Sequence, residues 1–269
     1  PGASLIVLCV PVMAMQSVMA ELAPLLDDDA VITDVGSTKG AIRDAALGVF
    51  GRMPPNLVLG HPIAGSEKSG VAASNPELYR DHKVILTPEP DSDAEAVARV
   101  AAMWSVCGAQ RLSMSVARHD EVLARTSHLP HLLAFSLVDS LARQDERLEI
   151  FRYAAGGFRD FTRIAGSDPV MWRDVYLANR DAVLEALDEF EAGVARVRAA
   201  VTAGDGEAML GIFTRASHAR HYFNTLLKQT SYQTMEQQNV RYRALPGGQV
   251  QGRIRVPGDK SMSHRSIML

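Results

Sequence analysis

The chain has 269 residues, of which 47% are hydrophobic and 22% are charged, with a formal net charge of −3; these values are typical of a soluble globular protein of one or two domains. The charge gives no reason to expect nucleic acid as a partner, and the longest apolar run, residues 5–15, is too short to cross a membrane. Cys9 and Cys107 both lie in apolar sequence and suggest no disulfide framework, so we expect a cytoplasmic protein.

The first 114 residues alternate between apolar runs of strand length and helical patterns. This alternation indicates an α/β domain built on a parallel sheet that is covered by helices. Strands are predicted at residues 4–10, 31–35, 57–60, 83–87 and 109–114, and helices at residues 13–26, 40–50 and 94–107.

From Ser115 to residue 244 the pattern is helical, and no strand is predicted before residue 249. Helices are predicted at residues 116–141, 169–202 and 205–228. Asp168 before Pro169 is a strong helix start, because aspartate caps a helix and proline fits its first position. Helices of this length rarely bury their apolar faces within one small monomer, so this all-α domain is predicted to form a homodimer.

The end of the chain has a different composition. Residues 245–252 are rich in glycine and are predicted to be a linker, and residues 253–269 turn basic. Lys260, Ser261 and Arg265 lie close together in this segment and suit an anionic ligand such as phosphate. Both ends of the chain look cut, and we expect a piece of a longer polypeptide.

Three groups of residues follow the predicted strands of the first half. They are Val10 with Pro11, Gly36-Ser37-Thr38-Lys39, and His61. Because ligands bind outside the carboxyl ends of strands in open parallel sheets, these groups are expected to face one crevice. His61, with Glu67 six residues further on, is a candidate acid or base, and the alternative is a surface histidine in a capped loop. Ser37 opens a helix, where its hydroxyl either meets a ligand or simply caps the helix.

The helical half supplies two further pairs of polar residues. His128 and His131 share a helix face that the intervening proline is predicted to distort. Three interpretations of this pair stay open: a metal site, histidines of the core, or contact with a substrate. Arg159 and Arg163 lie four residues apart and suit either a carboxylate-bearing substrate or surface ion pairs. Trp172 by itself is more typical of a core residue than of a ligand contact.

Five motifs occur in the order and at the spacing of the prephenate/arogenate dehydrogenases of tyrosine biosynthesis, and residues 1 to about 240 resemble that family. The motifs are LIVLCVPV (5–12), ITDVGSTKG (32–40), GHPIAGSEKSG (60–70), TSHLPHLLAFSLVD (126–139) and GGFRDFTRIAGSDPVMWRDV (156–175). The resemblance implies an α/β N-terminal part over residues 1–114, an incomplete Rossmann-like parallel sheet, followed by an all-α dimerisation domain over residues 115–244. It also implies oxidative decarboxylation of prephenate or arogenate to 4-hydroxyphenylpyruvate or tyrosine, with NAD or NADP as cofactor.

The resemblance further implies roles for particular residues. His61 matches the catalytic histidine, which takes the proton of the ring C4 hydroxyl as hydride leaves C4, and Ser37 matches the serine that holds the same hydroxyl. The substrate pocket is implied to include Glu67, His128, His131, Arg159, Arg163 and Trp172, with Arg163 binding a carboxylate. The cofactor is implied to contact Val10, Pro11, Ser37 and Thr38, and no metal site is expected.

The chain departs from that family at its start. The family's first strand, its G-x-G-x-x-G turn and the acidic residue about twenty positions further on have no counterpart here. Since these parts hold the pyrophosphate and ribose, we expect residues 1–269 alone to be inactive. Residues 252–265, GRIRVPGDKSMSHR, resemble the opening of 5-enolpyruvylshikimate-3-phosphate synthase, in which Lys260, Ser261 and Arg265 would bind phosphate and carboxylate groups. We therefore expect a fusion of two enzymes.

Other interpretations stay open. They are a different dehydrogenase that shares this sheet, a zinc hydrolase that uses His61, His128 and His131, and a non-catalytic dimerisation fragment that lacks the dinucleotide fingerprint. The sequence does not distinguish prephenate from arogenate, or NAD from NADP.

Overall fold

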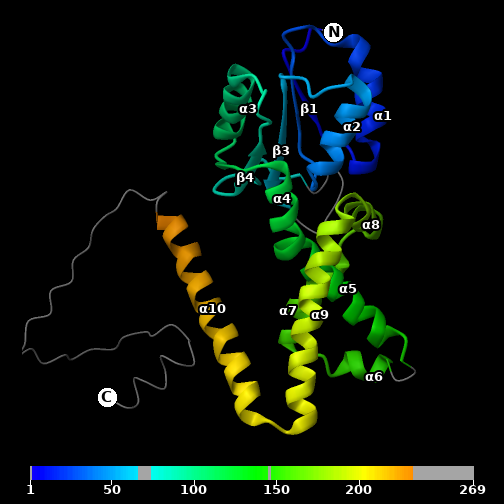
Figure 1. Cartoon of the computed structure of the whole chain (residues 1–269), viewed down its shortest axis with the longest axis vertical. Helices are drawn as coiled ribbons and strands as arrows, with labels where there is room; N and C mark the ends of the chain where they lie inside the picture. The colour runs from blue at the N-terminus through cyan, green and yellow to red at the C-terminus, as the bar shows by residue number, and fades with distance from the viewer. Residues whose placement is uncertain (1, 66–73, 145–146, 233–269) are drawn as a thin grey trace, which may run out of the picture. The chain divides into compact units, whose positions relative to one another are not determined.

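The structure is a computed structural model that describes residues 2–65, 74–144 and 147–232, and Figure 1 labels its helices and strands. The chain divides into a compact unit of residues 1–227, which contains the whole sheet, and a second unit of residues 228–269. Several predictions lie outside the described residues: Glu67, the linker at 245–252, and the phosphate-binding residues Lys260, Ser261 and Arg265.

Five strands form one sheet in the order β1-β2-β3-β4-β5. β1 (Leu5–Leu8), β2 (Val31–Asp34) and β3 (Leu57–Ile63) pair in parallel, and β4 (Lys83–Thr87) pairs in parallel with β5 (Gln110–Ser113). β3 and β4 run antiparallel. The predicted parallel pairing therefore holds for every pair except β3–β4, and the sheet is mixed.

The connection between β3 and β4 explains the antiparallel pair. A parallel pair needs a crossover of a dozen or more residues, usually a helix. The described residues between these strands, 64–65 and 74–82, contain turns and no helix. The antiparallel pairing also lengthens β3, because residues up to Ile63 pair with β4. The predicted end of this strand at residue 60 is wrong for that reason.

Helices cover both faces of the sheet (Figure 1). α1 (Met15–Leu22) and α2 (Gly40–Phe50) pack on one face, and α3 (Ala94–Val106) packs on the other. Each face has its own apolar cluster, centred on Met15 and Leu59 on one side and on Val58 and Trp104 on the other. Burial on both faces explains why β2, β3 and β4 contain continuous apolar runs. Two short 3₁₀ turns, η1 (Val12–Ala14) and η2 (Ala23–Leu25), flank α1.

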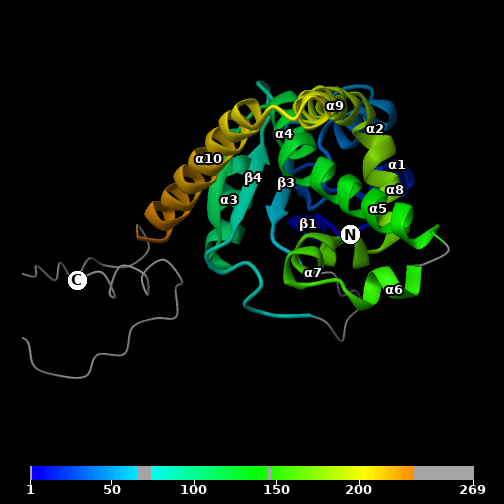
Figure 2. The same ribbon diagram turned by 90° about the horizontal axis from the view of Figure 1, so that it is seen from below.

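The rest of the described chain is helical, and Figure 2 shows α4, α5 and α9 from below. The elements are α4 (Val116–Leu123), η4 (Ala124–His128), α5 (Leu129–Ala142), α6 (Arg147–Arg152), α7 (Gly156–Thr162), η5 (Arg163–Gly166), α8 (Pro169–Ala178), α9 (Arg180–Ala203) and α10 (Gly206–Tyr232). Within the described residues, no helix is long and apolar enough to span a membrane.

Two predicted helices are divided in the structure. The helix predicted at 116–141 contains a π-helical turn, η4, just before Pro130. Proline has no N–H and its ring clashes with the carbonyl four residues earlier, so the distortion predicted at this place is confirmed one turn upstream of the proline. The helix predicted at 169–202 is divided at Asn179, whose φ and ψ of −122° and 35° are not helical. Cys9 and Cys107 are exposed, although their sequence surroundings are apolar.

A buried ion pair joins the end of β2 to the middle of β3. The Lys39 ammonium contacts the Asp34 carboxylate and donates to the carbonyl of Gly60 at 2.6 Å, and neither charged side chain is exposed. Asp34 also accepts the amides of Gly36 at 2.8 Å and Gly60 at 3.0 Å. A Cβ at Gly60 would lie 3.2 Å from the carbonyl of Asp34, so a glycine lets the end of β2 approach β3 this closely. The ion pair therefore holds the loop before α2 against β3, next to His61.

Lys39→Met should destabilise the fold by about 3–5 kcal/mol, because it leaves the buried Asp34 carboxylate without its counter-charge. Urea unfolding measures this change. Lys83→Met, at an exposed position of β4, is the matched control and should change the free energy of unfolding by less than about 0.5 kcal/mol. Equal effects of the two substitutions would show that the pair does not stabilise the sheet.

Candidate active site

His61 lies within β3 and is nine-tenths buried, with an exposed fraction of 9%. It lies beyond the part of β3 that pairs with β2, whose matched residues are Leu57 and Val58. The prediction that His61 stands at the end of a strand is wrong, since β3 continues alongside β4. His61 nevertheless lies past the carboxyl end of β2, which is where ligands bind in such sheets.

A hydrogen-bonded chain runs from His61 into the helical half. The Nδ1 of His61 lies 2.9 Å from Nε2 of His119, and the Nδ1 of His119 lies 2.7 Å from Oδ1 of Asp120. The ring centroids of the two histidines are 5.1 Å apart, in an edge-to-face arrangement. Both His119 and Asp120 belong to α4.

The Asp120 carboxylate also caps α2. It accepts the backbone amide of Lys39 at 2.8 Å and that of Gly40 at 2.7 Å. Burial opposes its ionisation, but the hydrogen bonds from His119 and from these two amides outweigh burial and lower its pKa below the ordinary value. Asp120 is therefore an anion that joins the start of α2, α4 and His61.

The surroundings of His61 favour its neutral form. Burial lowers the pKa of His61 well below 6.5, and the positive charge of Lys39 and the nearby His119 and His128 lower it further. A neutral imidazole at neutral pH is able to accept a proton.

His128 is also buried and neutral. Burial lowers the pKa of His128 to about 4, although the charge of Asp120 opposes the shift. The Asn179 amide donates to the Asp120 carbonyl at 2.9 Å and lies 3.2 Å from Nδ1 of His128. Asn179 is the residue that divides α8 from α9, so this break in the helix positions His128 relative to α4.

His131, Trp172 and Arg163 lie near one another on the helical side. The His131 ring stacks on Trp172 at 3.8 Å between centroids, and its Nδ1–H donates to the carbonyl of Ser127 at 2.9 Å. Burial lowers the pKa of His131, and the positive charge of Arg163 adds to the effect. The Trp172 Nε1–H is buried and has no hydrogen-bond partner among the described residues. His128 lies edge-on to the same indole, so both histidines contact Trp172.

The residues predicted to bind a cofactor, Val10, Pro11, Ser37 and Thr38, differ in how deeply they are buried. Thr38 is fully buried, and its hydroxyl has no hydrogen-bond partner among the described residues. Ser37 beside it is half-buried, Val10 packs against the sheet core, and Pro11 is exposed at the start of η1. A buried hydroxyl without a partner, next to a serine at the end of a parallel strand, fits a polar group of a bound nucleotide.

Sequence reasoning missed two residues that organise this site, His119 and Asn179. Lys39 belongs to the predicted strand-end group, but its buried ion pair with Asp34 was not predicted. The notable signal was the His119–Asp120 pair, because an imidazole beside a carboxylate at the start of a helix is suited to orient another group. Arg159 is exposed on α7, and no described contact joins it to His61 or His131.

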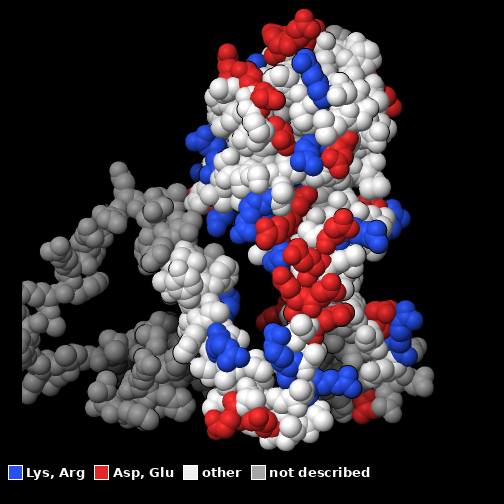
Figure 3. All heavy atoms as spheres, viewed as in Figure 1, with Lys and Arg blue, Asp and Glu red and all other residues white. Residues whose placement is uncertain are grey.

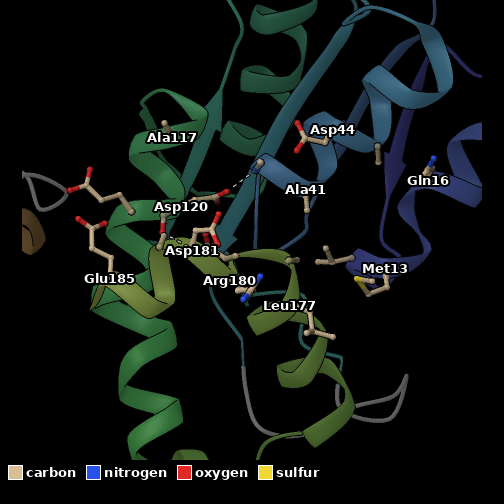
Figure 4. A pocket seen from close by; sticks show the side chains of 17 residues that line it. Met13, Gln16, Ala41, Asp44, Ala117, Asp120, Leu177, Arg180, Asp181 and Glu185 are labelled. Carbon is tan, nitrogen blue, oxygen red and sulfur yellow. Dashed lines mark hydrogen bonds between the residues drawn. The ribbon is translucent and has the colours of Figure 1, made fainter. Parts of the chain in front are cut away.

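An open cavity of about 1030 Å³ has Asp120 in its lining (Figure 4). Its walls come from η1, α1, α2, α4, the end of α8 and the start of α9, and none of the residues predicted for the site lines it. Its charged lining is mainly acidic, namely Asp44, Asp120, Glu121, Asp181 and Glu185 against Arg180. Figure 3 shows acidic side chains gathered over α4 and α9, where Glu121, Glu185 and Glu189 surround Arg125. A cavity with this charge does not suit a substrate that carries carboxylates.

No group of three or more His, Cys, Asp or Glu side chains among the described residues is placed to hold a metal ion. The buried histidines instead bond to one another, to Asn179 and to the backbone.

An α/β sheet with covering helices is joined to a helical part through the buried histidines His61 and His119. This arrangement is typical of a dehydrogenase with a nucleotide-binding domain and a helical domain. The family described as "Prephenate dehydrogenase, nucleotide-binding domain" matches residues 2–113, and "Prephenate dehydrogenase, dimerization domain" matches residues 115–215. The chain belongs to the prephenate dehydrogenase family.

Curated relatives and solved structures agree with this assignment. The cyclohexadienyl dehydrogenase of Zymomonas mobilis is 41% identical over 221 residues, 81% of this chain and 74% of that protein. The prephenate dehydrogenase of Bacillus subtilis is 38% identical over 222 residues, and the chain spans only 59% of its length. The structure of prephenate dehydrogenase from A. aeolicus in complex with hydroxyphenyl propionate and NAD+ has a TM-score of 0.76 at 37% identity, over 82% of this chain and 76% of that one.

A short segment matches a second enzyme. The 3-phosphoshikimate 1-carboxyvinyltransferase of Hydrogenovibrio crunogenus is 68% identical over 31 residues, which is 12% of this chain and 7% of that protein. This match supports the predicted fusion to the opening residues of such an enzyme.

Gly40→Ala should displace Asp120, because a Cβ at Gly40 would lie 2.8 Å from its Oδ2. Losing this contact with a charged group should cost about 1.5–3 kcal/mol and outweigh the gain in helix propensity of about 1 kcal/mol. Gly48→Ala in the same helix is the matched control, because its Cβ meets only the end of the Gln16 side chain, at 3.3 Å. Thermal unfolding should show a lower Tm for Gly40→Ala and an unchanged or higher Tm for Gly48→Ala; a higher Tm for both would contradict the capping role of Asp120.

Proposed function

We propose that this chain carries the NAD- or NADP-dependent oxidative decarboxylation of prephenate, or of arogenate, to 4-hydroxyphenylpyruvate or tyrosine. The observation that carries the proposal is the buried, neutral His61, whose Nδ1 is bonded to His119 and whose Nε2 has no hydrogen-bond partner among the described residues. Membership of the prephenate dehydrogenase family supports the same reaction.

His61 is the general base of the proposed reaction. Its Nε2 accepts the proton of the C4 hydroxyl as that carbon is oxidised to the carbonyl level, and the ring becomes aromatic when the ring carboxylate leaves as CO2. Ser37 holds the same hydroxyl. A base must be unprotonated at the working pH, and burial beside Lys39 keeps His61 in that state.

The helical residues bind the rest of the substrate. Arg163 pairs with a carboxylate, and its charge already acts on His131. His128 and Trp172 complete the wall around His131, and Arg159 and Glu67 are assigned to the same pocket from the family resemblance. A substrate with two carboxylates suits a site that combines guanidinium groups with neutral imidazoles.

Val10, Pro11, Ser37 and Thr38 would hold the nicotinamide end of the cofactor. When bound, NAD or NADP supplies the acceptor for the hydride from C4. The buried Thr38 hydroxyl, which has no hydrogen-bond partner among the described residues, supports this contact.

The helical half is proposed to form a homodimer. α9 and α10 expose large apolar side chains, among them Phe190, Val201, Phe213 and Phe223. Burying such a face against a second copy would remove it from water. The sedimentation coefficient at micromolar concentration checks this, and a monomer would contradict it.

In the fused segment, Lys260, Ser261 and Arg265 are proposed to bind phosphate. Titration with shikimate 3-phosphate tests this, and unchanged affinity after Lys260→Ala would refute it.

His61→Asn should lower kcat by about 10²-fold or more, the usual size of a general-base contribution, because an amide does not take up the proton. The full-length protein as encoded is assayed for NADH formation with prephenate. The Kd for prephenate should change little, and near-normal turnover would remove His61 from the mechanism.

The pH profile gives a second measure of the same group. Because the pKa of His61 lies well below 6.5, kcat/KM should stay level as the pH falls from 8 to 6.5 and should decline only below that. A decline centred above pH 7 would show that His61 is not the neutral base described.

Arg163→Ala should raise KM by roughly 10–150-fold, since a lost charged hydrogen bond costs about 1.5–3 kcal/mol. Arg143→Ala is the control, because Arg143 pairs only with Asp139 on the surface of α5 among the described residues. A KM that is unchanged with both prephenate and arogenate would show that Arg163 does not bind substrate.

A further inference from the structure

We propose that His119 is a positioning residue that selects the tautomer of His61, so that Nε2 of His61 is the atom left to accept a proton. This inference rests on the proposed role of His61 as the base. It adds a residue that no family motif singled out and that reaches the substrate only through another side chain.

The direction of the protons follows from the Asp120 carboxylate. An ionised carboxylate only accepts hydrogen bonds, and Asp120 receives the Lys39 amide, the Gly40 amide and Nδ1 of His119. The Nδ1 of His119 must therefore carry a hydrogen. When His119 is neutral, its Nε2 then has a lone pair and accepts the hydrogen of His61 Nδ1 across 2.9 Å. The Nε2 of His61 is left without a hydrogen.

This order matters because a neutral imidazole has two forms, and only one of them has a lone pair on Nε2. Without an acceptor beside Nδ1, His61 would populate both forms, and the form with hydrogen on Nε2 would be unable to take the substrate proton. The backbone of β3 does not supply that acceptor in the structure; the contact to Nδ1 comes from α4.

His119 has no access to substrate. Its exposed fraction is 0%, and its ring lies between His61 and Asp120, with both of its nitrogens already in contact. It therefore acts on the reaction only through His61. The negative charge of Asp120 lies one residue further along the chain of hydrogen bonds and offsets the positive charge that His61 gains when it takes up a proton.

The kinetic test uses the full-length protein and a double-mutant cycle. His119→Phe removes the acceptor and fills a similar space, and His119→Gln restores a carbonyl acceptor without an imidazole. We expect kcat to fall about 10–100-fold in His119→Phe, the usual effect of losing an orienting partner, with KM changed less than about threefold. His119→Gln should recover a large part of the loss.

The cycle separates positioning from packing. In a His61→Asn background, His119→Phe should cause no further loss of kcat, because the group it orients is gone. A loss of the same size in both backgrounds would show a merely structural role and would overturn the inference. A His119→Phe variant with wild-type kcat would overturn it as well.

The tautomer itself is read by ¹⁵N NMR of the histidine rings in the wild-type protein, with the His61 signal assigned from His61→Asn. We expect hydrogen on Nδ1 of His61 in the wild type and in His119→Gln, which keeps an acceptor, and a shift toward hydrogen on Nε2 in His119→Phe, which has none. Hydrogen on Nε2 in the wild type would refute the inference. If His61→Asn turns over normally, the proposed function fails while the NMR result still decides the tautomer; if only the His119 variants are normal, the function stands and this inference fails.

Discussion

The carboxylate of Asp120 is the interaction on which the rest of the site depends. It caps α2 through the amides of Lys39 and Gly40, and it holds His119, which in turn holds His61. A helix N-terminus stabilises an anion, and the same anion orients an imidazole. One side chain of α4 therefore fixes the sheet half against the helical half at the place where the proposed base lies.

The charges around this anchor explain why His61 suits a base. Lys39 is buried with Asp34 and places a positive charge near His61, and this charge together with burial keeps the imidazole neutral. Asp34 balances the positive charge of Lys39 locally. On the helical side, the charge of Arg163 lowers the pKa of His131. The proposed site thus combines a neutral proton acceptor with a guanidinium group, a combination that suits a carboxylate-bearing substrate.

Much of the fold could be predicted from the sequence, because apolar runs and helical spacing report burial directly. All five strands, the change to helices after residue 114 and the distortion near Pro130 are of this kind. The antiparallel β3–β4 pair could not be predicted, since strand direction depends on a connection that has no periodic pattern of its own.

In the site, family motifs pointed to His61, His128, His131 and Trp172, and their roles stay proposals. His119 and Asn179 were missed because their importance comes from contacts with residues 51 to 59 positions away. Lys39 was expected at a strand end, but its contacts with Asp34 and Gly60 were not predicted.

Control of the proposed base His61 by the anion at Asp120 is open to a direct test. The most direct measurement is kcat for NADH formation by Asp120→Asn at saturating prephenate and cofactor, in full-length protein shown to be folded by its thermal unfolding. An asparagine has the same shape, but its NH2 group would face donors and it carries no charge. The account predicts that kcat falls by about 10-fold or more with KM nearly unchanged. A kcat within twofold of the wild type would contradict it.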